Sequence, residues 1–118
     1  MIRIGLIQTD EELQQVFRLR YDVYVEELGA TMAHADHHAK ALHDEWDTTA
    51  DIIGAWHNDE LVGCVRLNFS DKTDLAEYEP FFHPLAKKTG KVSITSKLVV
   101  AKAFHAISEG TEGFIHLI

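Results

Sequence analysis

The densest group of side chains able to ligate a metal lies between residues 34 and 44. It consists of four histidines and two aspartates: His34, His37, His38, His43, Asp36 and Asp44. On a helix, His34 and His38 would share one face, a spacing that can bind zinc. The glutamate of an H-E-x-x-H zinc helix does not stand between them, and a solvent-facing helix could carry the same residues. We therefore expect no metal at this cluster.

One side chain is a candidate nucleophile, and the one thiol is explained by packing. Ser96 is a candidate catalytic residue, although no Gly-x-Ser-x-Gly elbow surrounds it, and the alternative is a hydrogen bond within a sheet. Cys64 is the single cysteine and lies in the apolar run Leu61–Val65, where buried thiols are common. We interpret Cys64 as a core residue.

The composition indicates one compact domain over residues 1–118. Of these residues 46% are hydrophobic and 25% are charged, with only 2 Pro and 7 Gly. The formal net charge is -8, and the 11 basic residues are scattered. A basic stripe for nucleic acid or for an anionic membrane surface is therefore missing. No apolar run approaches the length that spans a bilayer, and we expect a cytoplasmic protein.

The elements that must position these residues begin with a strand over Ile2–Leu6 and a helix. Thr9 to Glu12 forms a capping box, in which the Thr9 hydroxyl and the Glu12 carboxylate satisfy backbone amides. Gly29 predicts a left-handed stop at the end of this helix. Its apolar stripe is predicted to consist of seven residues: Leu13, Val16, Phe17, Arg20, Tyr21, Tyr24 and Leu28.

The rest of the chain alternates between apolar runs and polar connections. An Ala- and His-rich segment predicts a second helix over Met32–Trp46. A hairpin follows over residues 50–69, then a polar segment with a short helix around 75–82 or 85–88, and then a strand over Val92–Val100. The order predicts an α+β (or α/β) domain with a mostly antiparallel sheet and flanking helices.

Several segments together resemble the GNAT superfamily of N-acyltransferases. The helix segment Val16–Gly29 resembles its first helix, most closely in the branch of N-acyl amino acid synthases and acyl-homoserine-lactone synthases. Residues 44–47, followed by the hairpin over 51–67, resemble the acidic segment and central hairpin of that branch. The segment Ser96–Val100 is similar to its fourth strand. The order of these segments carries the resemblance.

The resemblance implies a twisted sheet that holds an acyl thioester, from coenzyme A or an acyl carrier protein, as substrate. A backbone amide of the fourth strand would polarise the thioester carbonyl, and here it would come from Leu98, Val99 or Val100. The family binds the cofactor pyrophosphate at a following glycine-rich turn, for which Gly110, His105 and Lys102 are the candidates. Glu109 and Glu112 place negative charge at that turn, so an ordinary loop is the alternative.

Acidic residues correspond loosely to those that orient the amine in the lactone-synthase branch. Glu45 and Asp47, with Asp51, could hold an ammonium or accept its proton. Acids on a solvated helix end are the alternative. The fourth strand of the family often begins with a glutamate that serves as base, and Ile94-Thr95 stands there instead.

The resemblance also implies more sheet than this chain supplies. We expect the N-terminal half of the acyl-CoA N-acyltransferase fold, truncated before the closing strands. The function expected is acyl transfer to a small amine; the alternative is a non-catalytic remnant that acts as an assembly module. In either case the Val92–Val100 strand would be an open apolar edge, which predicts a homo-oligomer through that edge.

Overall fold

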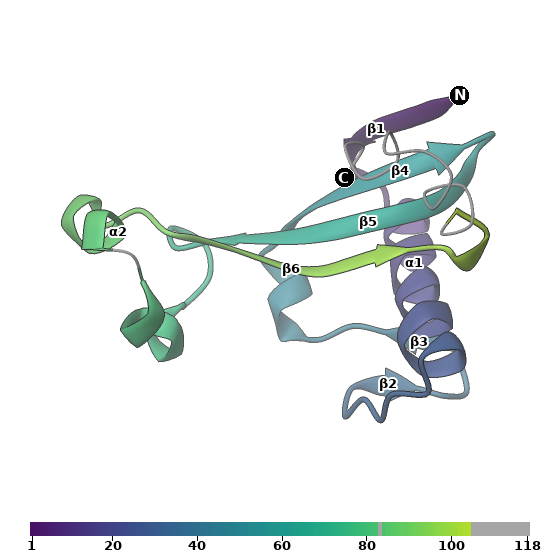
Figure 1. Cartoon of the computed structure of the whole chain (residues 1–118), viewed down its shortest axis with the longest axis horizontal. Coiled ribbons are helices and arrows are strands. Elements are labelled where there is room, and N and C mark those ends of the chain that lie inside the picture. Colours follow the sequence, from purple (N-terminus) through teal and green to yellow (C-terminus); the bar gives the residue numbers. More distant parts are fainter. Residues whose placement is uncertain (83, 105–118) are drawn as a thin grey trace.

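A computed structural model describes residues 1–82 and 84–104, and the polypeptide is shown in Figure 1. Within these residues, strands β1 (Ile2–Leu6), β4 (Asp51–His57), β5 (Glu60–Phe69) and β6 (Ser93–Val100) form one sheet in the order β1-β4-β5-β6. Every pairing in this sheet is antiparallel. The predicted α+β class with a mostly antiparallel sheet is confirmed.

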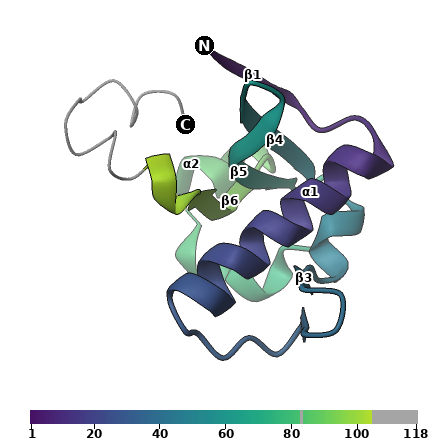
Figure 2. The same cartoon turned by 90° about the vertical axis from the view of Figure 1, so that its right-hand side faces the viewer.

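One long helical segment covers a single face of this sheet (Figure 2). It consists of α1 (Asp10–Tyr21), which continues directly into the π-helix η1 (Asp22–Glu27). The predicted capping box is present: the Thr9 hydroxyl accepts from Glu12 N at 3.1 Å, and the Glu12 carboxylate accepts from Thr9 N at 3.1 Å. Gly29 has a φ of 65°, as the predicted stop requires.

The core lies between this helix and the sheet. The helix contributes Val16, Phe17, Leu19 and Val23, and the strands contribute Ile52, Trp56, Leu61, Cys64 and Val99. Leu28, predicted to lie on the same stripe, is 65% exposed, so this part of the prediction is wrong. The backbone amide of Leu28 donates a hydrogen bond to the carbonyl of Val23, five residues earlier, as in a π-helix. Because a π-helical turn holds more residues than an α-helical turn, the side chains that follow are rotated away from the apolar stripe of α1.

The predicted helix over Met32–Trp46 is also wrong. That segment forms a small hairpin of β2 (Ala35–Asp36) and β3 (Ala41–Leu42), followed by the 3-10 helix η2 (Glu45–Thr48). The Asp36 carboxylate accepts hydrogen bonds from the backbone amides of His38 and Ala39 at 3.0 and 2.9 Å. These bonds stabilise a turn between β2 and β3 in place of a helix. Lys40, with a φ of 53°, completes the reversal.

The β4–β5 hairpin turns at Asn58 and Asp59, whose positive φ values suit a two-residue turn that matches strand twist. At its other end β5 continues far beyond the helix-covered region (Figure 1). There it is connected to β6 through the 3-10 helix η3 (Ala76–Phe81) and the short helix α2 (Pro84–Thr89). Both predicted helical segments in this region are therefore present. Among the described residues, no helix is long and apolar enough to cross a membrane.

Candidate functional site

A buried ion-pair network connects α1, η2 and β5. Arg20 Nη1 lies 2.9 Å from the Asp47 carboxylate and donates a hydrogen bond to Oδ2. Arg66 Nη1 lies 3.4 Å from Asp47 and donates to Asp44 Oδ1 at 2.7 Å. Two guanidinium groups and two carboxylates thus balance each other's charge. The network fixes the 3-10 helix against the sheet, as expected for buried charges that must be paired.

The same network reaches strand β6. Arg66 Nε donates to Ser96 Oγ at 3.1 Å, across the β5–β6 pair. This bond agrees with the alternative interpretation of Ser96, a hydrogen bond within the sheet. Asp44 also accepts from Trp46 N at 2.9 Å and caps η2. Partial burial raises the pKa of Asp44, but the hydrogen bond and positive charge of Arg66 outweigh it and hold that pKa below its usual range.

A β-bulge interrupts β6 immediately after Ser96. Ser96 pairs with Arg66 and Val99 pairs with Cys64, so Lys97 and Leu98 both stand opposite Val65. Lys97 has a φ of 55°, and among the described residues with positive φ other than glycine it is the one inside a strand. A left-handed backbone costs a residue with a Cβ about 1–2 kcal/mol. This bulge is therefore a strained feature, of the kind that concentrates at functional sites.

The bulge changes which side chains share a face. In a regular strand Ser96 and Lys97 would point to opposite faces, whereas here both line one cavity of about 770 Å³. Lys97 Nζ lies 5.4 Å from the centroid of the Tyr24 ring. The cavity is lined by eleven residues: Tyr24, His34, Asp44, Glu45, Trp46, Arg66, Glu77, Tyr78, Ile94, Ser96 and Lys97. We refer to it as the central cavity.

The central cavity contains two of the three predicted catalytic residues. Glu45 and Ser96 line it, while the Asp47 side chain is 3% exposed and lies behind it in the ion-pair network. Analysis of the sequence missed Arg66, Lys97, Tyr24 and Tyr78 as site residues. One signal was available for Arg66: an arginine inside the otherwise apolar run of β5 must find a buried partner.

The three predicted amide donors differ in their setting. The backbone amide of Ala101 donates to the carbonyl of Val62 at 2.8 Å. Along an antiparallel ladder, residue pairs that exchange hydrogen bonds alternate with pairs that do not. Val99, opposite Cys64, therefore belongs to a bonded pair, and the Val100 N–H points to the outer edge of β6. Leu98 stands in the bulge with its side chain 56% exposed.

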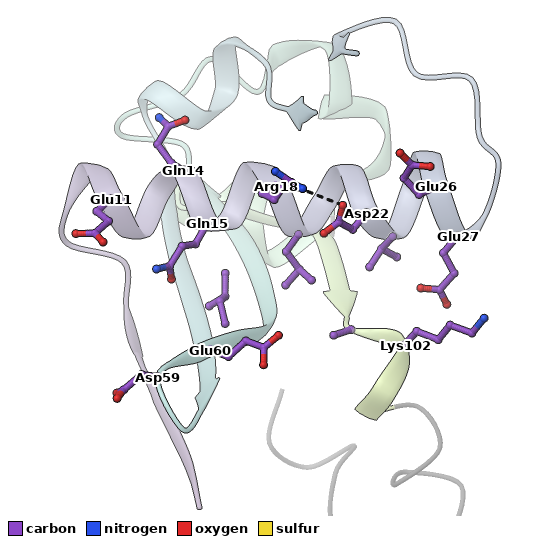
Figure 3. A pocket seen from close by; sticks show the side chains of 14 residues that line it. Glu11, Gln14, Gln15, Arg18, Asp22, Glu26, Glu27, Asp59, Glu60 and Lys102 are labelled. Atoms are coloured by element: carbon purple, nitrogen blue, oxygen red, sulfur yellow. Dashed lines mark ion pairs between the residues drawn. The ribbon is translucent and has the colours of Figure 1, made fainter. Parts of the chain in front are cut away.

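A second cavity, of about 930 Å³, lies between the helix and the turn of the β4–β5 hairpin (Figure 3). Lys102, which follows β6, and the hairpin residues Asp59 and Glu60 form its other wall. Its charged side chains are six acids and two bases: Glu11, Asp22, Glu26, Glu27, Asp59, Glu60, Arg18 and Lys102. Arg18 is paired with Asp22 at 3.5 Å. The net negative charge of this acidic groove opposes a diphosphate beside Lys102.

The other proposed pyrophosphate ligands, His105 and Gly110, lie outside the described residues. Among the described residues, the histidine cluster forms no group suited to a metal ion. His37 Nδ1 instead lies 2.8 Å from the Tyr21 hydroxyl, and His43 stacks on Phe17 with ring centroids 4.6 Å apart. These histidines pack the small hairpin against α1.

The sequence of the chain matches the profile of the acetyltransferase (GNAT) domain over residues 19–108. The chain belongs to this family. The match to the GNAT domain includes every residue that lines the central cavity. Acetyltransferase-type acyl transfer is the reaction of the family, and acyl-CoA is its general acyl donor. A comparison with curated proteins found no match.

Proposed function

We propose that this GNAT domain is an N-acyltransferase that moves an acyl group from acyl-CoA or an acyl carrier protein to a small amine in the central cavity. The observation that carries the proposal is the bulge of β6, which places Ser96 and Lys97 on the cavity face, beside a strand edge that no other described strand pairs with. Such an edge can offer backbone N–H groups to a thioester carbonyl. The likeness to N-acyl amino acid synthases and acyl-homoserine-lactone synthases is part of this proposal.

Each residue has a separate role in the proposed reaction. The outward N–H of Val100, with Leu98 and Val99 beside it, polarises the thioester carbonyl, so that negative charge on its oxygen is stabilised as the amine attacks. Glu45 attracts and holds the amine substrate, and Asp47 positions Glu45 by holding η2 to Arg20. Ser96 orients the Arg66 side chain. Lys102 would contact the pyrophosphate against the negative charge of the acidic groove, so the family resemblance, which also names His105 and Gly110, is the sole support for this role.

Proline substitutions test the amide directly. Val100→Pro removes a donor that faces the open edge, and proline is tolerated on edge strands. Val99→Pro removes a ladder donor and is expected to unfold the sheet. We expect V100P to keep the circular dichroism spectrum of the wild-type chain and to lose about 10²–10³-fold in kcat, as when one oxyanion donor is removed. Wild-type turnover by folded V100P would contradict this assignment.

A calorimetric titration with acetyl- and long-chain acyl-CoA tests whether the donor binds. We expect saturable binding by the full chain, and no heat of binding at millimolar ligand would contradict the proposal. The acyl length with the highest affinity identifies the donor class.

The open edge of β6 also favours a homo-oligomer as the second proposal. Among the described residues β6 pairs with β5 alone, and Leu98 beside the free edge is 56% exposed. A non-catalytic assembly role would use the same edge. Light scattering at tens of micromolar is expected to give the mass of a dimer, and a monomer would overturn this proposal.

A further inference from the structure

Charges are distributed unevenly in the central cavity. Arg20, Arg66, Asp44 and Asp47 balance one another's charge in the ion-pair network, of which Arg66 and Asp44 also line the cavity. Three charged side chains that line the cavity remain: Glu45, Glu77 and Lys97. Neither glutamate forms an ion pair with another described residue, and both side chains belong to exposed residues. Lys97 is half-buried and acts on the Asp44 carboxylate deeper in the network.

Aromatic rings accompany the two free carboxylates. Glu45 and Trp46 are neighbours on η2, and Glu77 and Tyr78 are neighbours on η3. The Trp46 and Tyr78 rings meet edge to face with centroids 5.5 Å apart, so the two short helices lie side by side. Aromatic faces and carboxylates both attract an organic cation. The solvent-exposed part of the cavity therefore suits a positive charge.

The β6 wall has the opposite character. Lys97 of β6 lines it, and a nearby positive charge disfavours protonation of an amine. Acyl transfer requires a neutral amine as the nucleophile. An amine that reaches this wall would thus be held in its reactive form, while a second amine could remain protonated between η2 and η3.

We propose that the acceptor is a diamine, or an amine with a second fixed positive charge, whose cationic end is held by Glu45 and Glu77 beside Trp46 and Tyr78. This inference rests on the proposed acyl transfer but names its acceptor class. One amine lies at the β6 wall and attacks the thioester carbonyl. The new amide bond forms as the carbon–sulfur bond breaks, and the proton lost by the amine ends on the leaving thiolate.

Binding of three probes that share a four-carbon chain tests the inference without turnover. The full chain is titrated by calorimetry at neutral pH with 1,4-diaminobutane, butylamine and 4-aminobutyrate. Because an exposed ion pair contributes up to about fivefold in affinity, we expect the diamine to bind about tenfold more tightly than butylamine. 4-Aminobutyrate should bind most weakly. Equal or tighter binding of butylamine or 4-aminobutyrate would overturn the inference.

Charge-neutral variants locate the cationic end. Glu77→Gln and Glu45→Gln should each reduce the preference for the diamine by about two- to fivefold. Glu79→Gln is the matched control, because Glu79 is exposed on the same helix but does not line the cavity. An unchanged preference in both E45Q and E77Q would also overturn the inference. If the diamine binds as expected but is never acylated, acyl transfer fails and the binding site stands.

Discussion

Arg20 and Asp47 stand 27 residues apart in the chain and form an ion pair whose side chains are 1% and 3% exposed. The pair joins the sheet-covering helix to the 3-10 helix that carries Glu45 and Trp46. Arg20 Nη2 and Nε have no hydrogen-bond partner of their own among the described residues, so Asp47 is the main compensation for this buried charge.

Asp47→Asn is therefore expected to destabilise the fold by about 3–5 kcal/mol, because it leaves the buried Arg20 guanidinium facing a neutral amide. Urea unfolding monitored by tryptophan fluorescence measures the change. Asp22→Asn is the control, since its pair with Arg18 is exposed and contributes at most about 0.5 kcal/mol. Equal stability losses in D47N and D22N would contradict the buried-network account.

Low pH should weaken the ion pair between Arg66 and Asp44, the residue that caps η2. The pKa of Asp44 is lowered in the folded chain, so its contribution to stability is present above the ordinary value of 3.8 and is lost as the pH falls through the folded pKa. We expect the free energy of unfolding to fall below about pH 4, and less steeply in Asp44→Asn. Parallel pH profiles for D44N and wild type would show that Asp44 is not responsible.

Cys64 is expected to be inert in the folded protein. The thiol is 2% exposed, and burial raises its pKa to about 12 against the opposing influence of Arg20. A thiol-specific chromogenic reagent at pH 8 should label native protein only at the rate of unfolding, and should label it at once in urea. Immediate labelling without denaturant would contradict the placement of Cys64.

The bulge in β6 makes a further prediction about stability. Lys97→Gly removes the strain of the left-handed backbone, whereas Lys97→Val adds a β-branched side chain to the same conformation. We expect K97V to be less stable than K97G by about 1–3 kcal/mol. Thr95→Val on the same strand is the control for a change to valine in regular backbone. Equal free energies of unfolding for K97V and K97G would contradict a left-handed backbone at position 97.

The fold was predictable where local signals and the final structure agree. The capping box at Thr9, the turn at Asn58-Asp59 and the apolar run of β5 each specify one local conformation. The segment 32–46 was mispredicted because its Ala- and His-rich composition suits a helix, while Asp36 closes a turn through its own side chain. Tertiary contacts of Leu42 and His43 with α1 then favour the hairpin.

The candidate site was predictable only in part. Glu45 and Ser96 were identified, but Lys97 reaches the same cavity through a bulge, which changes the alternation of a strand without a sequence signal at Ser96-Lys97. Tyr24 and Tyr78 come from segments 54 residues apart that only the fold brings together. Backbone donors such as the Val100 N–H carry no side-chain signature at all.

Acyl transfer by the full chain is the decisive measurement for the proposed function. The full chain is incubated with acetyl-CoA and a set of amines that includes 1,4-diaminobutane, while released coenzyme A thiol and the mass of each amine are followed together. The account predicts one N-acetylated amine for each thiol released, at a rate that V100P reduces strongly. Intact thioester and unmodified amines, in a sample that binds acetyl-CoA, would contradict it.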